Sequence, residues 1–192
     1  MGLFKKFKAP KGKIELKLDE VSYEATDKLT GKILLDPDED ISVDEFRIEF
    51  DGKKKVKWKK GFSSYNATSS LETRKIPVGG SAKLAKGQHH EQPFKIDIPQ
   101  YSRPDPFTEL EVMVKGVATV QDRPDLTSDV KPVINFLYVT ECPRQYGGCG
   151  FISQPSTEPV RTCPKCGHNL EEAWNRKYSD ESRRAAQGSR RF

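Results

Sequence analysis

Long apolar runs are missing from this chain of 192 residues. No segment approaches the roughly 20 consecutive apolar residues that a membrane-spanning helix needs. The first residues, MGLFKKFKAPKGK, lack the apolar centre of a secretory signal. These two absences predict a cytoplasmic protein without a transmembrane segment.

Motifs of common enzymes are also missing. The sequence contains no phosphate-cradling glycine loop, no nucleophile elbow and no HExxH helix motif. The net charge of +5 comes from 33 basic and 28 acidic residues spread along the chain. Such a mild charge permits contact with nucleic acid or an anionic membrane but requires neither. We therefore expect a protein that is not an enzyme.

Cysteine is scarce and confined to one stretch. The four cysteines are Cys142, Cys149, Cys163 and Cys166. In a reducing compartment, a CxxC pair beside a second cysteine pair is more often a metal site than a disulfide site. Four thiolates match the tetrahedral coordination of zinc. The spacing predicts one structural Zn²⁺ ion in a small zinc ribbon over residues 141–168.

The two cysteine pairs differ in their loops. Cys163 and Cys166 lie in a CPKCG turn, where Gly167 permits a sharp exit, whereas six residues, PRQYGG, separate Cys142 from Cys149. The first pair therefore forms a longer, irregular loop. A redox CxxC, an iron–sulfur cluster and His168 in place of Cys142 are the alternatives. Catalytic zinc is disfavoured because four thiolates leave no position for water.

Before the cysteines, apolar and polar residues alternate with the period of β-strands. The pattern predicts strands near residues 12–18, 28–35, 46–50, 53–60, 71–78, 94–98, 109–121 and 130–140. Asp51-Gly52 predicts a hairpin turn, and the polar stretch at 61–70 predicts a loop. The run VINFLYV, apolar on both faces, predicts a central strand. The fold class is therefore all-β, an antiparallel β-sandwich over residues 12–140.

The basic strand Lys53–Lys60 has two interpretations. As an amphipathic strand it directs Val56 and Trp58 to the core and its lysines to solvent, which deters aggregation at sheet edges. As a phosphate-binding stripe it would contact nucleic acid. The first interpretation is favoured. His89 and His90 lack metal-site spacing and are expected in a surface turn.

Four segments of the chain resemble the N-terminal domain of the arrestin fold. They are YEATDKLTGKILL (23–35), ISVDEFRIEFDGKKKVKW (41–58), KGQHHEQPFKIDIPQYSRPDPF (86–107) and ELEVMVKGVATVQDRPDLTSD (109–129). The resemblance implies an arrestin-like β-sandwich that serves as a non-catalytic scaffold or adaptor and recruits protein partners. The chain departs from the family because it has no second arrestin domain and no PPxY motif, and because a cysteine segment follows the sandwich.

The two ends of the chain complete the predicted organisation. Residues 1–11 form a flexible basic arm, in which Leu3, Phe4 and Phe7 could make transient membrane contact. A short helix is expected over 169–178 and a disordered tail over 179–192. The favoured function is a protein-recruiting adaptor, and the alternative is a nucleic-acid-binding protein that uses the ribbon and Lys53–Lys60.

Overall fold

The computed structural model describes residues 8–188, which form two compact units. The first unit contains the described residues up to Gly52 together with Glu72–Gln100 and Val112–Asn135. The second unit contains Lys53–Leu71, Tyr101–Glu111 and the described residues from Phe136 onward. The predicted domain boundaries at residues 140 and 168 stay predictions.

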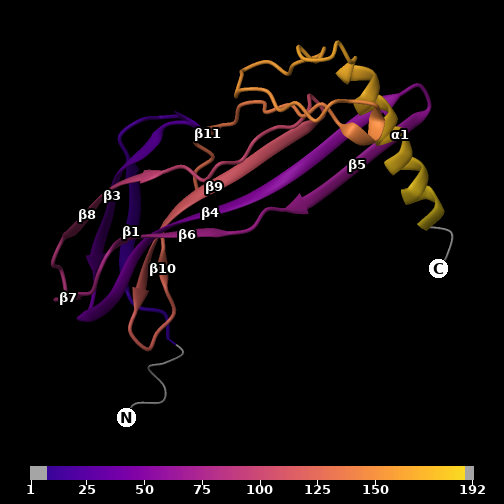
Figure 1. The fold of residues 1–192 in the computed structure, drawn as a ribbon. Helices are drawn as coiled ribbons and strands as arrows, with labels where there is room; N and C mark the ends of the chain where they lie inside the picture. The colour runs from indigo at the N-terminus through magenta and orange to yellow at the C-terminus, as the bar shows by residue number, and fades with distance from the viewer. Residues whose placement is uncertain (1–7, 189–192) are drawn as a thin grey trace. The chain divides into compact units, whose positions relative to one another are not determined.

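Antiparallel strands dominate the described chain (Figure 1), which confirms the expectation of a mainly β protein. The strands are β1 (Gly12–Leu18), β2 (Tyr23–Glu24), β3 (Lys28–Pro37), β4 (Ile41–Lys60), β5 (Ser63–Ser70), β6 (Arg74–Gly79), β7 (Ala82–Leu84), β8 (His90–Asp97), β9 (Thr108–Val120), β10 (Leu126–Thr127) and β11 (Ile134–Asn135). One sheet has the order β1-β3-β8, and a second has the order β10-β9-β4-β5, with β6 and β7 also paired to β4.

The core of the first unit lies between strands of these two sheets. In β3, Leu29, Ile33 and Leu35 are fully buried and alternate with more exposed residues, as the sequence predicts. A Cβ atom on Gly116 of β9 would lie 3.1 Å from Cγ1 of Ile33, so β9 approaches β3 closely at this point. Side chains from two facing sheets therefore fill one apolar layer, as in a β-sandwich.

The predicted hairpin at Asp51-Gly52 is wrong, because β4 runs unbroken through these residues. β6 pairs with Phe46–Phe50 and β5 with Lys53–Lys60, so two later strands share one long partner. The chain turns instead at Gly61-Phe62, where Gly61 has a φ of 58°. A glycine with positive φ at the first position is typical of a type II′ hairpin turn.

Two further sequence predictions are wrong. The stretch predicted as a polar loop at 61–70 is mostly strand β5, because cross-strand pairing with β4 fixes a segment that has no apolar alternation. The predicted long strand at 130–140 contains only β11, which pairs with β2 in parallel, and isolated bridges at Lys131 and Tyr138. Its apolar side chains are mostly half-buried, so apolarity on both faces does not mark a central strand here.

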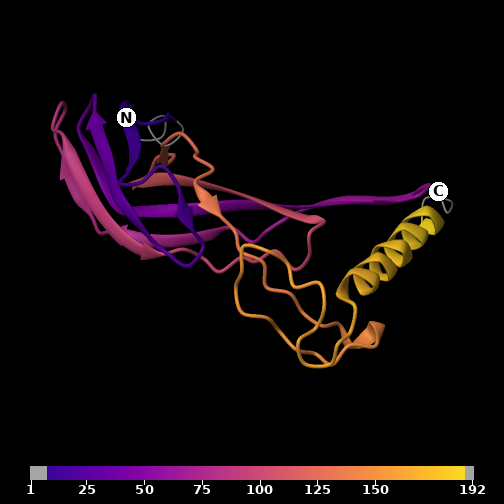
Figure 2. The same cartoon turned by 90° about the horizontal axis from the view of Figure 1, so that it is seen from above.

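The second unit contains the hairpin end of β4 and β5, the 3₁₀ helix η2 (Arg144–Tyr146) and the helix α1 (Leu170–Gly188). Figure 2 shows α1 as one continuous helix. It extends ten residues beyond the predicted end at 178, so the prediction of disorder is wrong for 179–188, whereas 189–192 lie outside the described residues. Glu, Arg and Ala in this stretch favour helix, and Ser182 Oγ donates a hydrogen bond to the Ser64 carbonyl at 2.8 Å.

Part of the predicted flexible arm is fixed to the first unit. Arg123 donates hydrogen bonds to the carbonyls of Lys8 and Ala9, and Pro10 is buried. The predicted membrane contacts at Leu3, Phe4 and Phe7 lie outside the described residues. Within 8–188, no helix is both long enough and apolar enough to cross a membrane.

Candidate metal centre

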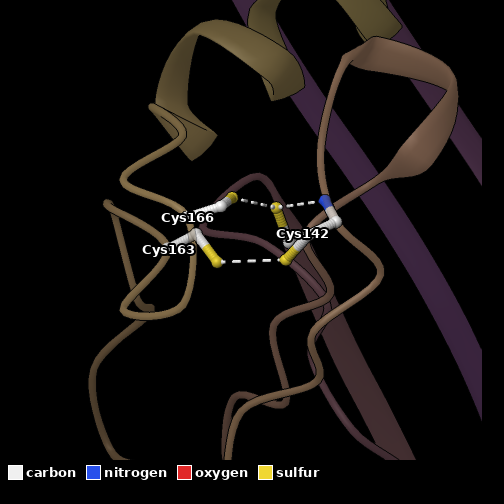
Figure 3. A group of neighbouring side chains, drawn as sticks. Cys142, Cys163 and Cys166 are labelled. Carbon is white, nitrogen blue, oxygen red and sulfur yellow. Dashed lines mark hydrogen bonds between the residues drawn. The ribbon is translucent and has the colours of Figure 1, made fainter.

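The structure brings the four predicted cysteines together in the second unit. Their Sγ atoms all lie within 4.8 Å of one another, and among the described residues they form the one cluster suited to a metal ion. Figure 3 shows the side chains of Cys142, Cys163 and Cys166 converging. Cys142 and Cys163 are buried, Cys149 is half-buried and Cys166 is exposed.

The sulfur–sulfur distances fit a tetrahedral metal ion. Cys142 Sγ lies 3.8 Å from Cys166 Sγ, and Cys149 Sγ lies 3.7 Å from Cys163 Sγ. Four sulfurs arranged tetrahedrally at a zinc–sulfur distance of about 2.3 Å are about 3.8 Å apart. A disulfide bond needs a sulfur–sulfur distance of about 2.05 Å, so these pairs are not disulfides. The cluster therefore has the dimensions of a four-thiolate metal site.

The long loop of the first pair closes through its backbone. Cys142 N donates to the Phe151 carbonyl, and Gly150 N donates back to the Cys142 carbonyl at 2.9 Å. The extra residues form η2, so Cys149 returns to Cys142 and its N–H donates to Cys142 Sγ at 3.3 Å. A Cβ on Gly148 would lie 2.6 Å from Cys142 Sγ, so only glycine fits beside the sulfur.

The second pair lies on the predicted CPKCG turn. Gly167 has a φ of 72° and donates to the Cys163 carbonyl at 2.9 Å, which brings the chain sharply back. His168 does not join the sulfur cluster: its Nε2 is buried without a hydrogen-bond partner, and its ring lies 3.6 Å from the position of a Cβ on Gly147. Cys142 itself occupies the fourth position, which disfavours His168 as its replacement.

The pKa values of the two buried thiols shift in opposite directions. Burial raises the pKa of Cys142 to about 12. Burial also opposes ionisation of Cys163, but the backbone N–H groups of Cys166 and Lys165 stabilise its thiolate and lower its pKa to about 7. A bound cation would stabilise the thiolate form of all four sulfurs.

The cysteines belong to the hydrophobic core of the second unit. Cys142 and Cys163 pack with the buried residues Val56, Trp58, Leu170, Trp174 and Tyr178. These residues come from β4 and α1. Trp58 is fixed further because its Nε1 donates to Asn175 Oδ1 at 2.9 Å. The sulfur cluster therefore lies where the hairpin and the helix meet.

A buried polar contact beside this core was not predicted from the sequence. Tyr178 OH donates to Asp105 Oδ2 at 2.5 Å, and Thr108 Oγ1 donates to Asp105 Oδ1 at 2.9 Å. Both Tyr178 and Asp105 are 1% exposed. Because 73 residues separate the two, no local motif could have revealed the pair. The contact fixes α1 to the segment that precedes β9.

The lysines of the basic strand point away from this core and are partly neutralised. Val56 and Trp58 are buried, whereas Lys57 and Lys59 are exposed, as predicted. Lys57 Nζ lies 3.1 Å from Glu109, and Lys55 forms an ion pair with Glu111. The strand is therefore not an uninterrupted cationic stripe.

A groove of about 650 Å³ lies between the hairpin end and α1 within the second unit. Its lining combines aromatic, hydroxyl and charged side chains, among them Trp58, Lys60, Tyr146, Asn175, Arg176 and Arg183. The side chains of Arg176 and Arg183 are 66% and 72% exposed. The groove is therefore open to solvent, and its border carries charges of both signs, because Arg176 and Arg183 form ion pairs with Glu172 and Asp180 of the same lining.

No protein-family model matches the chain. No curated protein matches it either. Among solved structures, 44 chains match, including Spo0M, a sporulation control protein from Bacillus subtilis. The sequence identity to Spo0M is 16% and the TM-score is 0.48; the match covers 65% of this chain and 49% of Spo0M, so the chain spans about half the length of that protein. At this level of similarity the match carries no argument about function.

Proposed function

We propose that the protein is a non-catalytic adaptor whose second unit is held together by one structural zinc ion, with Cys142, Cys149, Cys163 and Cys166 as its ligands. The observation that carries the proposal is the set of four sulfurs within 4.8 Å of one another. Four thiolates complete a zinc tetrahedron and leave no position for water or substrate. The ion would therefore stabilise structure.

The surroundings of the sulfurs support this structural role. Two cysteines are part of the core in which Trp58 of β4 packs with Trp174 and Tyr178 of α1. A metal ion at this place would connect the cysteine loops directly to the apolar contacts that hold the helix. Binding of zinc would thus contribute to the folding free energy of the second unit.

The groove beside α1 is the surface that we assign to a protein partner. Aromatic and arginine side chains are enriched at protein interfaces, where they provide contact area and directed hydrogen bonds. The groove offers the half-buried Tyr146 and the exposed Arg176 and Arg183, whereas Trp58, which also lines it, is buried. The arrestin-like sequence pattern also favours an adaptor.

The nucleic-acid alternative has weaker support. Lys55 and Lys57 are paired with Glu111 and Glu109, so phosphate groups would have to displace existing ion pairs. A salt titration of binding to single- and double-stranded DNA and RNA tests this alternative. Steeply salt-dependent binding that is lost when Lys55, Lys57 and Lys59 are changed to Glu would contradict the adaptor assignment.

The metal is tested by elemental analysis of natively purified protein. We expect about one zinc per chain for the wild type and none for the double variant Cys163→Ser with Cys166→Ser. The far-UV spectrum of the variant should keep its β signal, because the first unit contains none of the cysteines. Iron in place of zinc, or no metal in the wild type, would refute the zinc assignment.

The adaptor role is tested by affinity capture with matched variants. Arg176→Glu with Arg183→Glu reverses two charges in the groove, and Lys83→Glu with Lys86→Glu reverses two exposed charges in the first unit as a control. A true partner should be retained by the wild type and the control, lost by the groove variant, and bound directly as a purified protein. If no captured protein binds directly, the adaptor proposal is wrong.

A further inference from the structure

Among the strands of residues 8–188, none lies beside one long edge of β5. β5 is the last strand in the order β10-β9-β4-β5, and its partner is β4. Within residues 8–188 no other strand pairs with it. The N–H and C=O groups on its outer side therefore form an open template for another strand.

The register shows which residues expose these groups. Lys60 and Ser63 flank the two-residue turn, so they form a hydrogen-bonded pair, and every second residue of β5 after Ser63 also bonds to β4. The residues between them, Asn66 and Thr68 among them, direct their backbone groups outward. The backbone of β4 shows the same alternation of inward and outward groups: Lys57, which lies opposite Asn66, directs its N–H away from β5 to the Phe107 carbonyl.

In the described part of the chain, one end of this outer edge accepts a hydrogen bond from α1. The Ser64 carbonyl accepts a hydrogen bond from Ser182 Oγ of α1 at 2.8 Å. The outward N–H and C=O groups of Asn66 and Thr68 have no hydrogen-bond partner among the described residues. The open part of the edge is thus centred on Ala67.

The composition of β5 differs from the rest of the chain. Charged residues make up 32% of the sequence, yet the eight residues of β5, SSYNATSS, include none. Edge strands are commonly protected from pairing by lysine, proline or a bulge. β5 has neither lysine nor proline, and its pairing with β4 is regular from Lys53 to Lys60. The strand therefore lacks the usual protection.

We propose that a second copy of this chain pairs with the outer edge of β5. The two β5 strands run antiparallel about a two-fold axis at Ala67, so Asn66 of each copy lies opposite Thr68 of the other. Each of these residues donates one N–H and accepts with one C=O, so the pairing adds about four backbone hydrogen bonds. The resulting interface is isologous, as in most homodimers.

The sequence of β5 fits itself in this register. Small Ala67 residues meet at the axis, polar Asn66 faces polar Thr68, and no charge faces a like charge. The lysines of the two β4 strands are separated by three strand spacings, about 14 Å. This exceeds the Debye length of about 8 Å at physiological salt, so their repulsion is screened. These features favour a second copy over a charged partner strand.

The test is a pair of charge variants in the full chain. Asn66 and Thr68 have exposed side chains, and on β4 their neighbours are Lys57 and Lys55. Asn66→Glu with Thr68→Glu places like charges opposite each other across the axis, while each new carboxylate faces a lysine within its own hairpin. Asn66→Glu with Thr68→Lys places opposite charges across the axis and is the control; its new lysine faces Lys55, whose charge is already paired with Glu111.

Sedimentation velocity over a protein concentration series gives the dissociation constant of the dimer. We expect the wild type to dimerise, the Glu/Glu variant to raise the dissociation constant at least about fivefold, and the Glu/Lys variant to restore it. Zinc content verifies that each variant is folded and does not depend on dimerisation, so the zinc and adaptor proposals are tested separately.

A second measurement needs no variant. Amide hydrogen exchange at Asn66 and Thr68 should slow as the wild-type concentration rises, because their outward N–H groups become bonded in the dimer. The proposal is overturned if the wild type stays monomeric up to about 1 mM. A dissociation constant above this concentration corresponds to a binding free energy weaker than about 4 kcal/mol. The proposal is also overturned if both charge variants weaken the dimer equally, or if the edge binds only a foreign extended peptide.

Discussion

Replacing Tyr178 with Phe removes one oxygen atom from the core of the second unit and leaves the ring in place. The hydroxyl donates to Asp105 Oδ2 at 2.5 Å, and both residues are almost fully buried. Asp105 then keeps its hydrogen bonds from Thr108 Oγ1 and the Phe107 N–H, and its 3.7 Å ion pair with Lys177 of α1, but loses its hydrogen bond from the helix. A hydrogen bond to a charged group contributes about 1.5–3 kcal/mol, so we expect Tyr178→Phe to lower the free energy of unfolding by that amount.

Tryptophan fluorescence measures this loss in the second unit. The chain has two tryptophans, Trp58 and Trp174, and both belong to this unit. With a urea dependence of about 1–3 kcal/mol per M, the fluorescence midpoint should fall by about 1 M. Tyr146→Phe is the matched control, since this half-buried tyrosine lies in the same unit and no hydrogen bond of its hydroxyl is found among the described residues. Equal midpoints for wild type and Tyr178→Phe would refute the role of the Asp105 contact.

Further predictions concern pH, the glycine beside the sulfur, and the metal. Burial, together with the contact to Asp105, raises the pKa of Tyr178. The neutral hydroxyl therefore stabilises the fold fully below the ordinary tyrosine pKa of about 10. This contribution to stability is lost as the pH rises through the pKa that Tyr178 has in the folded state. The stability difference between wild type and Tyr178→Phe should therefore shrink in urea titrations above about pH 10, and a constant difference would contradict this. Gly148→Ala would place a Cβ 2.6 Å from Cys142 Sγ and should lower the zinc affinity about 10-fold or more. Gly80→Ala is the control, because its Cβ would meet nothing within 4 Å. A competition titration with a zinc chelator compares the two variants, and equal affinities would exclude crowding at the sulfur. Chelation of the metal from the wild type should red-shift the tryptophan emission while the far-UV β signal persists, and loss of both signals together would show that the first unit also depends on the metal.

The alternation of apolar and polar residues along the sequence was sufficient to predict several strands. In β1, β3 and β8 the side chains alternate between the core and solvent, so the period of two in the sequence matches the period of burial. The cysteine spacing likewise predicted the cluster: the CPKCG turn brings Cys163 and Cys166 together, and the longer loop through η2 returns Cys149 to Cys142. These features depend on residues that are close in sequence.

Features that depend on distant partners were not predictable. Asp51-Gly52 would form a turn in isolation, but β5 and β6 both pair with β4 and keep it extended. Strand β5 has no apolar pattern and is fixed by its register with Lys53–Lys60. The contact between Asp105 and Tyr178 joins segments 73 residues apart. In each case tertiary pairing outweighs the local preference.

The C-terminal helix was predicted in part. Its first turn has acidic residues, Glu171 and Glu172, and Asn169 Oδ1 accepts a hydrogen bond from the Glu172 N–H at 3.1 Å as an N-cap. The last ten residues of the helix are mostly polar and lack a continuous apolar stripe, so composition alone indicates disorder. The hydrogen bond from Ser182 to Ser64 helps to fix this part, and no sequence pattern reveals it.

Zinc K-edge X-ray absorption of the natively purified protein tests the central claim most directly, because it measures both the metal and its ligands. We predict four sulfur ligands at about 2.3 Å and no nitrogen or oxygen ligand. A shell with fewer than four sulfurs, or with a water oxygen, would contradict the closed structural site and reopen the question of catalysis. The absence of a zinc edge would refute the assignment of the metal itself.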